Sequence, residues 1–284
     1  MASPVPTSPD LPLLTPRSGR VKAARRLARR VHRAELGLFL AEGPQAVREA
    51  LSVPGCVREV FAVASAAALH PEIREAGANL PWHLVDDAAL ASLADTVHPQ
   101  GLVAVCGHVD VPVEDLLAAW PGLVAVCADV RDPGNAGTVI RCADAAGADG
   151  VVLAGRSVDP YNGKTVRATA GSLFHLPVSM DEDTHGVVRR LQESGLTVLA
   201  ADGAGETDLD AAEDSGLLAR PTAWLFGNEA WGLPVDLAEL ADHRVSIPIH
   251  GRAESLNLAT AAAVCLYASA RARRGAAPRS GRDG

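Results

Sequence analysis

Polar side chains that could do chemistry occur in three segments of the second half of the chain. The segments are DPGNAGTVIRCADAAGADG (132–150), LFGNEAWGLP (225–234) and IPIHGRAESLNLATAAA (247–263). Each lies where a short apolar run, typical of a buried strand, is followed by a loop rich in Gly, Asn or Pro and then a helical pattern. Ligand sites in open α/β sheets lie at such strand ends, so we expect one composite pocket.

Five side chains in these segments are the candidate catalytic groups: Asn135, Arg141, Glu229, Ser255 and Asn257. Arg141 interrupts an apolar helical pattern, where a charge is rarely buried without a partner, so a structural ion pair remains open beside a catalytic role. Glu229 could equally cap the helix predicted after the loop. Ser255 and Asn257 could be the N-cap of the last helix. Their occurrence together at three strand ends favours a site.

The glycines argue against two common cofactor folds and for another kind of site. The first loop, RDPGNAG, matches neither a dinucleotide-binding GxGxxG nor a phosphate-binding GxxxxGK[ST] pattern. Gly227, Gly232 and Gly251 indicate a backbone that approaches a ligand or turns tightly. Loops with inward-facing amides and carbonyls suit a ligand such as an adenosine moiety. No Cys/His cluster has metal-ligand spacing, so we expect no metal.

Length and composition bound the remaining possibilities. The 284 residues are 48% hydrophobic, enough for one large or two ordinary domains with a real core. No stretch approaches the roughly 20 apolar residues of a membrane span, and the N-terminus is rich in Pro and Ser rather than apolar, so we expect no membrane association and a cytoplasmic location. The five scattered cysteines predict reduced core residues.

The net charge of −8 argues mildly against a nucleic-acid partner, but the charge distribution argues the other way. Basic residues cluster between Arg17 and Arg33, with Val21, Ala24, Ala28 and Val31 at helical spacing among them. This pattern predicts a basic amphipathic helix. A solvated helix face is one explanation, a membrane-surface helix is disfavoured by the small apolar residues, and phosphate contact is the third. The candidate RNA-binding residues are Arg25, Arg26, Arg29, Arg30 and Arg33.

The chain divides into two alternating strand–helix series. We expect a disordered tail over residues 1–16, a small α/β domain over 17–108, a linker over 109–121, a second α/β domain over 122–274 and a disordered basic tail over 275–284. Predicted strands include GLFLAEG, REVFAVAS, PWHLVDD and GLVAVCGHV in the first series, and GLVAVCADV, ADGVVLAG, LPVSM, LTVLAAD, TAWLFG and HRVSIPI in the second. A final helix is predicted from near Ser255.

The three motifs resemble those of the SpoU (TrmH-type) RNA ribose methyltransferases of the SPOUT superfamily. Asn135, Gly137 and Arg141 match the first family motif, and Gly227, Glu229 and Gly232 the second. The third motif is matched by the residues Ile247, Pro248, Gly251, Ser255, Leu256 and Asn257. The resemblance covers about residues 121 to 272, including the intervening VRATAGSLFHLPV.

The resemblance implies an α/β SPOUT domain whose parallel sheet carries a deep trefoil knot, an arrangement otherwise essentially absent from proteins. It implies a homodimer that binds S-adenosylmethionine, and an N-terminal substrate-binding domain similar to a ribosomal-protein-like RNA-binding fold. The implied cofactor-binding residues are Leu225, Phe226, Gly227, Asn228, Gly232, Ile247, Pro248, Ile249, Ser255 and Leu256.

The implied reaction is methyl transfer to a ribose 2′-hydroxyl of RNA, with rRNA of the large subunit (23S) favoured over tRNA. By the resemblance, Arg141 activates the hydroxyl, Asn135 places the nucleotide, and Glu229, Ser255 and Asn257 order the pocket. Because arginine keeps its charge at neutral pH, Arg141 could instead only clamp a substrate phosphate. A silent RNA-binding protein and a base-nitrogen methyltransferase are the other classes, and housekeeping and antibiotic-resistance roles both remain open.

Overall fold

The computed structural model describes residues 13–276, which form two compact units. The first comprises residues up to His108 together with Tyr161–Gly163, and the second comprises Val109–Pro160 and the chain from Lys164 onward. Of the two expected tails, residues 1–12 and 277–284 lie outside the described residues. The expectation is wrong for the described remainder, because Leu14 forms a parallel bridge with Val85 and the last helix extends to Ala276. Across residues 13–276, no helix is both long and apolar enough to cross a membrane.

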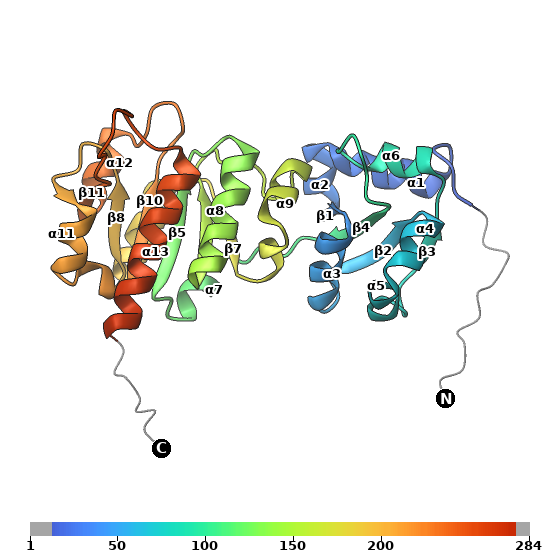
Figure 1. Ribbon diagram of the computed structural model, residues 1–284, viewed down its shortest axis with the longest axis horizontal. Helices are drawn as coiled ribbons and strands as arrows, with labels where there is room; N and C mark the ends of the chain where they lie inside the picture. The colour runs from blue at the N-terminus through green and yellow to red at the C-terminus, as the bar shows by residue number, and fades with distance from the viewer. Residues whose placement is uncertain (1–12, 277–284) are drawn as a thin grey trace, which may run out of the picture. The chain divides into compact units, whose positions relative to one another are not determined.

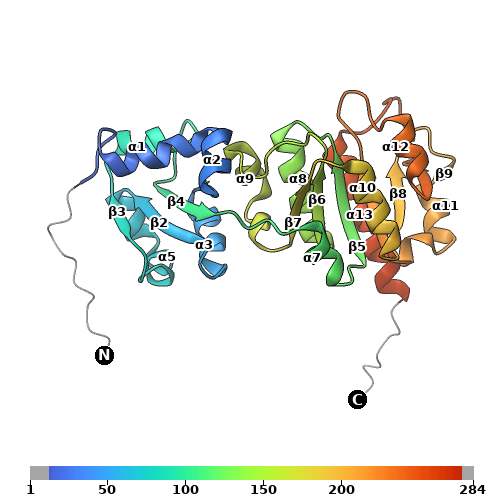
Figure 2. The same cartoon turned by 180° about the vertical axis from the view of Figure 1, so that it is seen from behind.

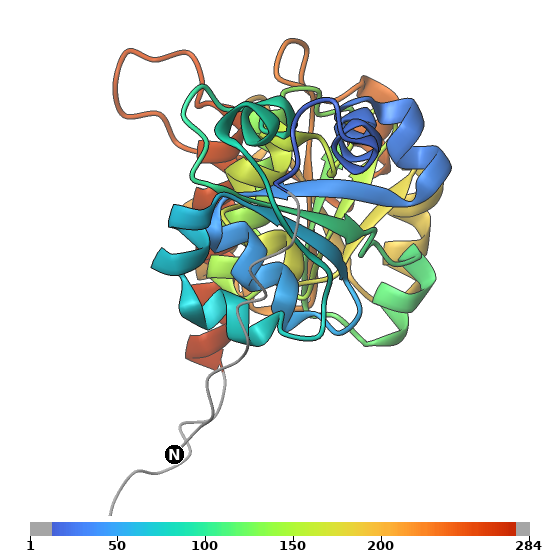
Figure 3. The ribbon, with the colours of Figure 1, turned by 90° about the vertical axis from the view of Figure 1, so that its right-hand side faces the viewer.

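The first unit is built on a four-stranded mixed sheet. Its strands are β1 (Leu38–Glu42), β2 (Val57–Ala62), β3 (Trp82–Leu84) and β4 (Leu102–Gly107), in the order β1-β4-β2-β3. Strand β4 is antiparallel to both neighbours, whereas β2 and β3 are parallel. The helices are α1 (Gly19–Arg25), α2 (Arg30–Leu36), α3 (Pro44–Ser52), α4 (Ala64–Leu69), α5 (Pro71–Ala76) and α6 (Asp87–Leu93). Helices α1 and α6 cover one face of this sheet, and α3 and α5 lie on the other (Figures 1 and 3).

The predicted single basic helix is wrong, because the segment breaks at Arg29. Helix α1 ends in a short 3-10 turn, η1 (Arg26–Ala28), and Arg29 is extended, with φ −97° and ψ 130°, before α2 begins. The buried apolar positions are Val21, Ala24 and Leu27, which pack on the sheet, whereas Val31 is 74% exposed. The expected apolar stripe through Ala28 and Val31 therefore does not form.

The second unit contains a seven-stranded sheet in which all pairs are parallel. In sequence the strands are β5 (Leu123–Ala128), β6 (Gly150–Ala154), β7 (Val178–Asp181), β8 (Thr197–Ala201), β9 (Thr207–Asp208), β10 (Thr222–Phe226) and β11 (His243–Ser246). The order across the sheet is β7-β6-β5-β10-β8-β11-β9. The two-residue strand β9 is absent from the sequence prediction. Every residue of β5, β6 and β10 is buried, as continuous apolar strands covered on both faces should be.

Helices cover both faces of this sheet. They are α7 (Val113–Ala118), α8 (Pro133–Ala146), α9 (Gly163–Thr169), α10 (Thr184–Glu193), α11 (Leu209–Asp214), α12 (Val235–Leu240) and α13 (Leu258–Ala276), with short 3-10 turns η2 (Ser172–Phe174) and η3 (Leu217–Ala219). Helices α8 and α13 pack together on one face (Figure 1). On the other face α7, α10 and α12 pack on alternate strand residues such as Val124 and Val126 (Figure 2). This alternation is the period-two pattern of a strand between two layers.

The expected linker over residues 109–121 is instead part of the second unit. Its middle forms α7, and Val113 and Leu116 are 2% exposed within the core under the sheet. Prolines Pro112 and Pro121 flank this helix without preventing it, because Pro112 stands at its N-cap. The segment SAAALHPEIREAG (65–77), whose composition alone predicts one helix, divides at Pro71 into α4 and α5, because proline begins a helix well and interrupts one.

Candidate active site

The three motif loops leave the sheet at the same edge. Strands β5, β10, β8 and β11 are neighbours in the sheet and run parallel, so their carboxyl ends lie side by side. The loop before α8 follows β5, the loop 227–234 follows β10, and the long loop 247–257 follows β11 and leads into α13. The composite arrangement expected from the sequence is therefore present.

A chain of hydrogen bonds joins one side chain from each motif. The Asn257 Nδ2 atom donates to Asn135 Oδ1 at 3.1 Å, and Asn135 Nδ2 donates to Glu229 Oε1 at 3.2 Å. Asn257 Oδ1 in turn accepts from the backbone N–H of Ala259 (2.9 Å) and Thr260 (3.3 Å), which begin α13. Residues separated by more than 90 positions in the sequence thus share one network.

The direction of this chain is fixed at both ends. A carboxylate only accepts hydrogen bonds and a helix N-terminus only donates them, so Glu229 orients the amide of Asn135, and α13 orients that of Asn257. Asn257 is accordingly the N-cap of α13, as one of the structural alternatives proposed, but it also contacts Asn135. The helix begins at Leu258, three residues later than predicted.

Glu229 does not cap the helix that follows its loop. Its Oε2 accepts from the backbone N–H of Arg131 (3.2 Å) and its Oε1 from that of Asp132 (3.0 Å), so it holds the loop between β5 and α8. Burial by itself raises the pKa of Glu229, but hydrogen bonds from its own backbone, from Asp132, from Asn135 and from Arg131 outweigh burial and bring the pKa below its ordinary value. The carboxylate is therefore ionised at neutral pH.

Asn135 lies in the first turn of α8 rather than in the preceding loop. Asp132 is the N-cap, and its Oδ1 accepts from the Asn135 backbone N–H at 2.9 Å. This hydrogen bond, together with an ion pair to Lys164 that is 3.1 Å long, lowers the pKa of Asp132 although burial opposes the shift. Gly137 follows on the packed face, where a Cβ would lie 2.6 Å from both Ala168 Cβ and the Thr165 carbonyl oxygen.

Arg141 is exposed on α8 and stands apart from the hydrogen-bonded chain. Within residues 13–276 it makes no hydrogen bond and no ion pair, so the structural ion pair considered for it is absent there. Six residues separate it from Asn135, which corresponds to about 9 Å along the helix axis. Its guanidinium is thus available to a ligand.

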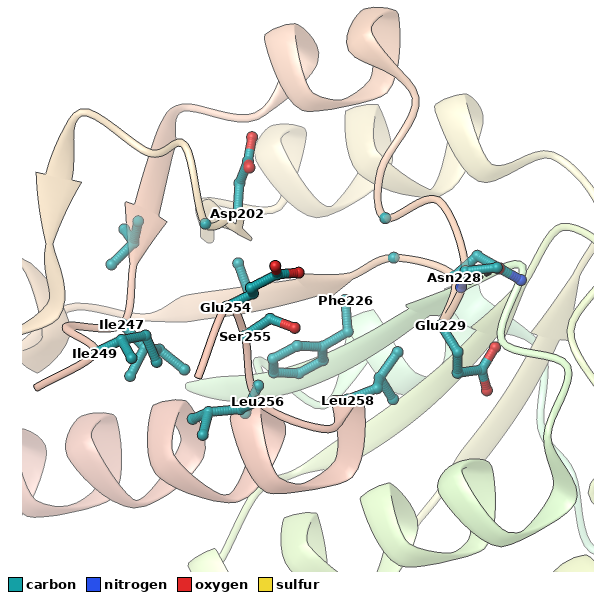
Figure 4. Close-up of a pocket in the computed structure, with 17 residues that line it drawn as sticks. Asp202, Phe226, Asn228, Glu229, Ile247, Ile249, Glu254, Ser255, Leu256 and Leu258 are labelled. Atoms are coloured by element: carbon teal, nitrogen blue, oxygen red, sulfur yellow. Dashed lines mark hydrogen bonds between the residues drawn. The ribbon is translucent and has the colours of Figure 1, made fainter. Parts of the chain in front are cut away.

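A pocket of about 380 Å³ lies beside the hydrogen-bonded side chains of Asn257, Asn135 and Glu229. It is between the ends of β8, β10 and β11 and the start of α13 (Figure 4). Its lining side chains include Phe226, Ile247, Ile249, Leu256 and Leu258, which make apolar walls, and Glu229 lies at the opposite end from Ile247 and Ile249. This volume falls within the range for small-molecule sites.

Eight of the ten expected cofactor-binding residues line this pocket: Phe226, Gly227, Asn228, Gly232, Ile247, Ile249, Ser255 and Leu256. Leu225 is instead fully buried in the core, and Pro248 is not among the lining residues. Ser255 lines the pocket and makes no hydrogen bond within the described part of the chain.

Gly227 and Gly251 differ in what they permit. A Cβ at Gly227 would lie 2.3 Å from the Gly232 carbonyl carbon and 2.5 Å from the Leu233 nitrogen, so the loop closes on itself only without a side chain. Nothing lies within 4 Å of a Cβ at Gly251, and its φ is not positive. Neither the backbone conformation nor the packing around Gly251 requires a glycine there, so approach to a ligand is the remaining explanation for it.

Two pocket carboxylates were missed by the sequence interpretation. Asp202 follows β8 and pairs with Arg244 at 3.1 Å, and Glu254 precedes Ser255 (Figure 4). Asp202 could have been found, since LTVLAAD has the same pattern of an apolar strand followed by a polar residue. In the described part of the chain no group of three or more His, Cys, Asp or Glu could hold a metal ion.

One of the five arginines proposed to contact RNA is not on the surface. Arg33 is 4% exposed, and its Nη1 donates to the carbonyls of Leu27 (2.8 Å) and Ala28 (2.9 Å). It therefore satisfies backbone acceptors at the break between η1 and α2, and its inclusion in the RNA-binding set is wrong. The other four, Arg25, Arg26, Arg29 and Arg30, are exposed.

Comparison with known proteins matches both units. The sequence profile of the SpoU rRNA Methylase family matches residues 122–267, and that of the MRM3-like substrate binding domain matches residues 19–104. A 23S rRNA (guanosine(2553)-2′-O)-methyltransferase of Bacillus subtilis is 35% identical over 251 residues, which is 87% of this chain and 94% of the relative. A 23S rRNA (uridine(2479)-2′-O)-methyltransferase of Streptomyces viridochromogenes is 37% identical over 62% of this chain and 61% of its own.

Solved structures agree. An AdoMet-bound rRNA methyltransferase from Sinorhizobium meliloti has a TM-score of 0.78 and 32% identity, covering 89% of this chain and 95% of the other. The SpoU methyltransferase AviRb from Streptomyces viridochromogenes, in complex with the cofactor AdoMet, has a TM-score of 0.78 and 30% identity, covering 91% and 99%. The resemblance deduced from the three motifs is confirmed, and the chain belongs to the SpoU rRNA methylase family.

Proposed function

We propose that this protein transfers a methyl group from S-adenosylmethionine to a ribose 2′-hydroxyl of 23S rRNA. The observation that carries this proposal is the directed chain Asn257–Asn135–Glu229, which joins the three motif loops beside the pocket at the carboxyl ends of parallel strands. The relatives from Bacillus subtilis and Streptomyces viridochromogenes, named for 2′-O-methylation of 23S rRNA, support the substrate.

The pocket residues fit the cofactor. Phe226, Ile247 and Leu256 offer apolar walls suited to an adenine ring, and the glycine at position 227 leaves backbone groups open to a ligand. The carboxylate of Glu254 on the lining suits the net positive charge of S-adenosylmethionine. When bound, the cofactor supplies an electrophilic methyl group on its sulfonium.

The protein's own groups then position the ribose. The hydrogen bonds to Glu229 and from Asn257 use one Nδ2 hydrogen and one Oδ1 lone pair of Asn135. The other Nδ2 hydrogen and the other lone pair can therefore orient a nucleotide hydroxyl or phosphate. Arg141, exposed and without an ion pair within residues 13–276, clamps a phosphate beside the attacking 2′-oxygen. Holding the reacting groups in place can contribute about 7 to 11 kcal/mol to such a reaction. As methyl transfer proceeds, the hydroxyl proton passes to a non-bridging oxygen of the clamped phosphate, because the Arg141 guanidinium is already protonated and only donates hydrogen bonds.

RNA contacts are proposed for the first unit. Arg25, Arg26, Arg29 and Arg30 are exposed on one short segment, and this unit matches a substrate binding domain. Arginine forks suit phosphate oxygens, so these residues position RNA without reading its sequence.

We also propose a trefoil knot in the second unit, a homodimer formed through that unit, and a cytoplasmic location, where ribosomal RNA is found. The half-exposed Tyr267 on α13 and the exposed Ile249 and Leu256 at the pocket support an interface between copies there. Sedimentation of the full chain, which should show a dimer, tests the homodimer.

The test of function is transfer of labelled methyl from S-adenosylmethionine to separate pools of unmodified rRNA and tRNA, by wild type and Arg141→Ala. We expect alkali-resistant label in the rRNA pool that the substitution abolishes, because a 2′-O-methyl blocks alkaline cleavage. Label in tRNA alone would show that tRNA, and not rRNA, is the substrate. Alkali-sensitive label would indicate a methylated base, and cofactor binding without transfer would indicate a silent RNA-binding protein.

A further inference from the structure

The loop 227–234 carries a tryptophan that the site described so far does not use. Trp231 is 55% exposed and is absent from the lining of the cofactor pocket, although its neighbours Ala230 and Gly232 line it. Single exposed apolar side chains are common, so exposure alone has no functional meaning. Trp231 differs from other exposed apolar residues in three ways: its loop is held by hydrogen bonds, a cation lies over its ring, and it is close to Glu229.

The backbone that holds Trp231 is fixed. Asn228 and Gly232 form a two-way bridge, with both N–H···O distances 2.9 Å. The Asn228 side chain, 6% exposed, donates to the Asp129 carbonyl at 2.6 Å and accepts from the Ala230 N–H at 2.8 Å. A large exposed ring on a loop tied in this way is a rigid surface rather than a mobile one.

A cation lies over the indole of Trp231. The Arg131 guanidinium carbon is 5.3 Å from the centre of the ring, within the range of a cation–π interaction. Arg131 also donates its backbone N–H to Glu229 at 3.2 Å, and Glu229 is bonded to Asn135. Trp231 lies two residues after Glu229 in the sequence, and Arg131 is hydrogen-bonded to Glu229. The ring and its cation are thus adjacent to the network that we assign to nucleotide placement.

Unpaired bases in RNA are held in proteins by stacking on aromatic rings and on arginine planes. The Trp231 ring, with Arg131 over it, offers such a stacking surface beside the groups that we assign to nucleotide placement. We propose that Trp231, supported by Arg131, stacks on an unstacked base of the RNA substrate at or next to the methylated nucleotide. This inference rests on the proposed function.

The experiment compares wild type with Trp231→Ala and Trp231→Phe. The matched control is Trp120→Ala, because Trp120 is 86% exposed in the same unit but precedes β5 and so lies at the opposite strand ends from the motif loops. Affinity for unmodified 23S rRNA is measured by filter binding, affinity for S-adenosylmethionine by calorimetry, and KM and kcat for rRNA by labelled methyl transfer.

We expect Trp231→Ala to weaken rRNA binding and raise the rRNA KM by about 5- to 150-fold, which corresponds to about 1–3 kcal/mol per stacked base. Trp231→Phe should recover most of this loss, Trp120→Ala should behave as wild type, and all four proteins should bind the cofactor equally. An unchanged rRNA affinity in Trp231→Ala, or no recovery by Phe, would overturn the proposal.

Other outcomes also decide the matter. Equal loss of cofactor affinity would make Trp231 a structural residue of the loop, and conversion of a dimer to a monomer would place the ring in a subunit interface; either overturns stacking. If wild type transfers no methyl to any RNA, the proposed function fails, but filter binding still tests whether Trp231 contacts RNA.

Discussion

Replacing Glu229 by glutamine tests whether the acceptor-only carboxylate organises the site. The substitution preserves shape, yet it turns one of the two oxygens into an NH₂ donor. Three donors from other residues converge on Glu229, two at Oε1, from Asp132 and Asn135, and one at Oε2, from Arg131. A glutamine that keeps its oxygen at the Oε1 position sets its NH₂ against the Arg131 N–H, so one hydrogen bond is lost and the other two lose their charge.

The magnitude follows from these contacts. A hydrogen bond to a charged group contributes about 1.5–3 kcal/mol net and a neutral one about 0.5–1.5 kcal/mol. Because Glu229 is exposed, the low end applies, and one lost bond plus two weakened ones amount to about 2 kcal/mol. If the loss of about 2 kcal/mol falls on the transition state of methyl transfer, kcat/KM is lowered roughly 30-fold. If it falls on the free energy of unfolding, Tm is lowered by about 4–8 °C.

The assay is methyl transfer to unmodified rRNA together with a thermal melt, with Glu239→Gln as control, since Glu239 is exposed on α12 outside this network. Glu229→Gln within threefold of wild type in kcat/KM and within 1 °C or so in Tm would refute the reasoning. A loss in both Glu variants would show a general effect of charge.

The same carboxylate sets a pH dependence. Its pKa is lower in the folded state than in the unfolded chain, so its contribution is present above the unfolded pKa and is lost as the pH falls through the lowered folded pKa. The Tm difference between wild type and Glu229→Gln should therefore stay constant from about pH 8 to 5 and shrink below about pH 4. A difference that grows with acidity would contradict the assignment.

Three further predictions concern single residues. Gly227→Ala should reduce cofactor affinity by at least tenfold in calorimetry, since its Cβ would meet the loop's own backbone at 2.3 Å, whereas Gly251→Ala should bind normally. Arg33→Ala should lower Tm by several degrees because it leaves two carbonyls without their donor, whereas Arg30→Ala should keep Tm and lower the salt dependence of RNA binding by about one ion. Arg141→Lys should bind the cofactor as wild type does but lose most methyl transfer, because lysine cannot form a bidentate phosphate contact; full turnover would contradict the clamp.

Much of the fold could be predicted from local sequence because the strands are continuous apolar runs bounded by turn residues. GLVAVCADV, TAWLFG and HRVSIPI all contain strands, and the polar residues that follow them meet at one sheet edge. A parallel strand that is buried on both faces is a continuous apolar run, so its ends can be recognised where polar or turn residues begin. The role of Gly227 was also recognised from the sequence, because a glycine in a loop after a strand indicates a backbone that must pack closely, as it does against Gly232 and Leu233.

What the sequence could not determine depends on packing against the sheets and on hydrogen bonds from side chains to the backbone. Helical spacing predicted a single basic helix, but burial of Leu27 and the hydrogen bonds from Arg33 to the Leu27 and Ala28 carbonyls favour a break at Arg29. Two prolines suggested a linker, but the core under the sheet accepts Val113 and makes that segment a helix.

The candidate site divides in the same way. The sequence by itself determined which residues carry polar groups and that strand ends bring their loops to one edge, because side-chain chemistry and strand limits are local properties. Only the tertiary structure decided that Glu229 accepts from the loop before α8, that Asn257 reaches Asn135 while capping α13, and that Arg141 stays unpaired within residues 13–276. Hydrogen bonds act over about 3 Å, so partners nearly a hundred residues apart are chosen by the fold that brings them together.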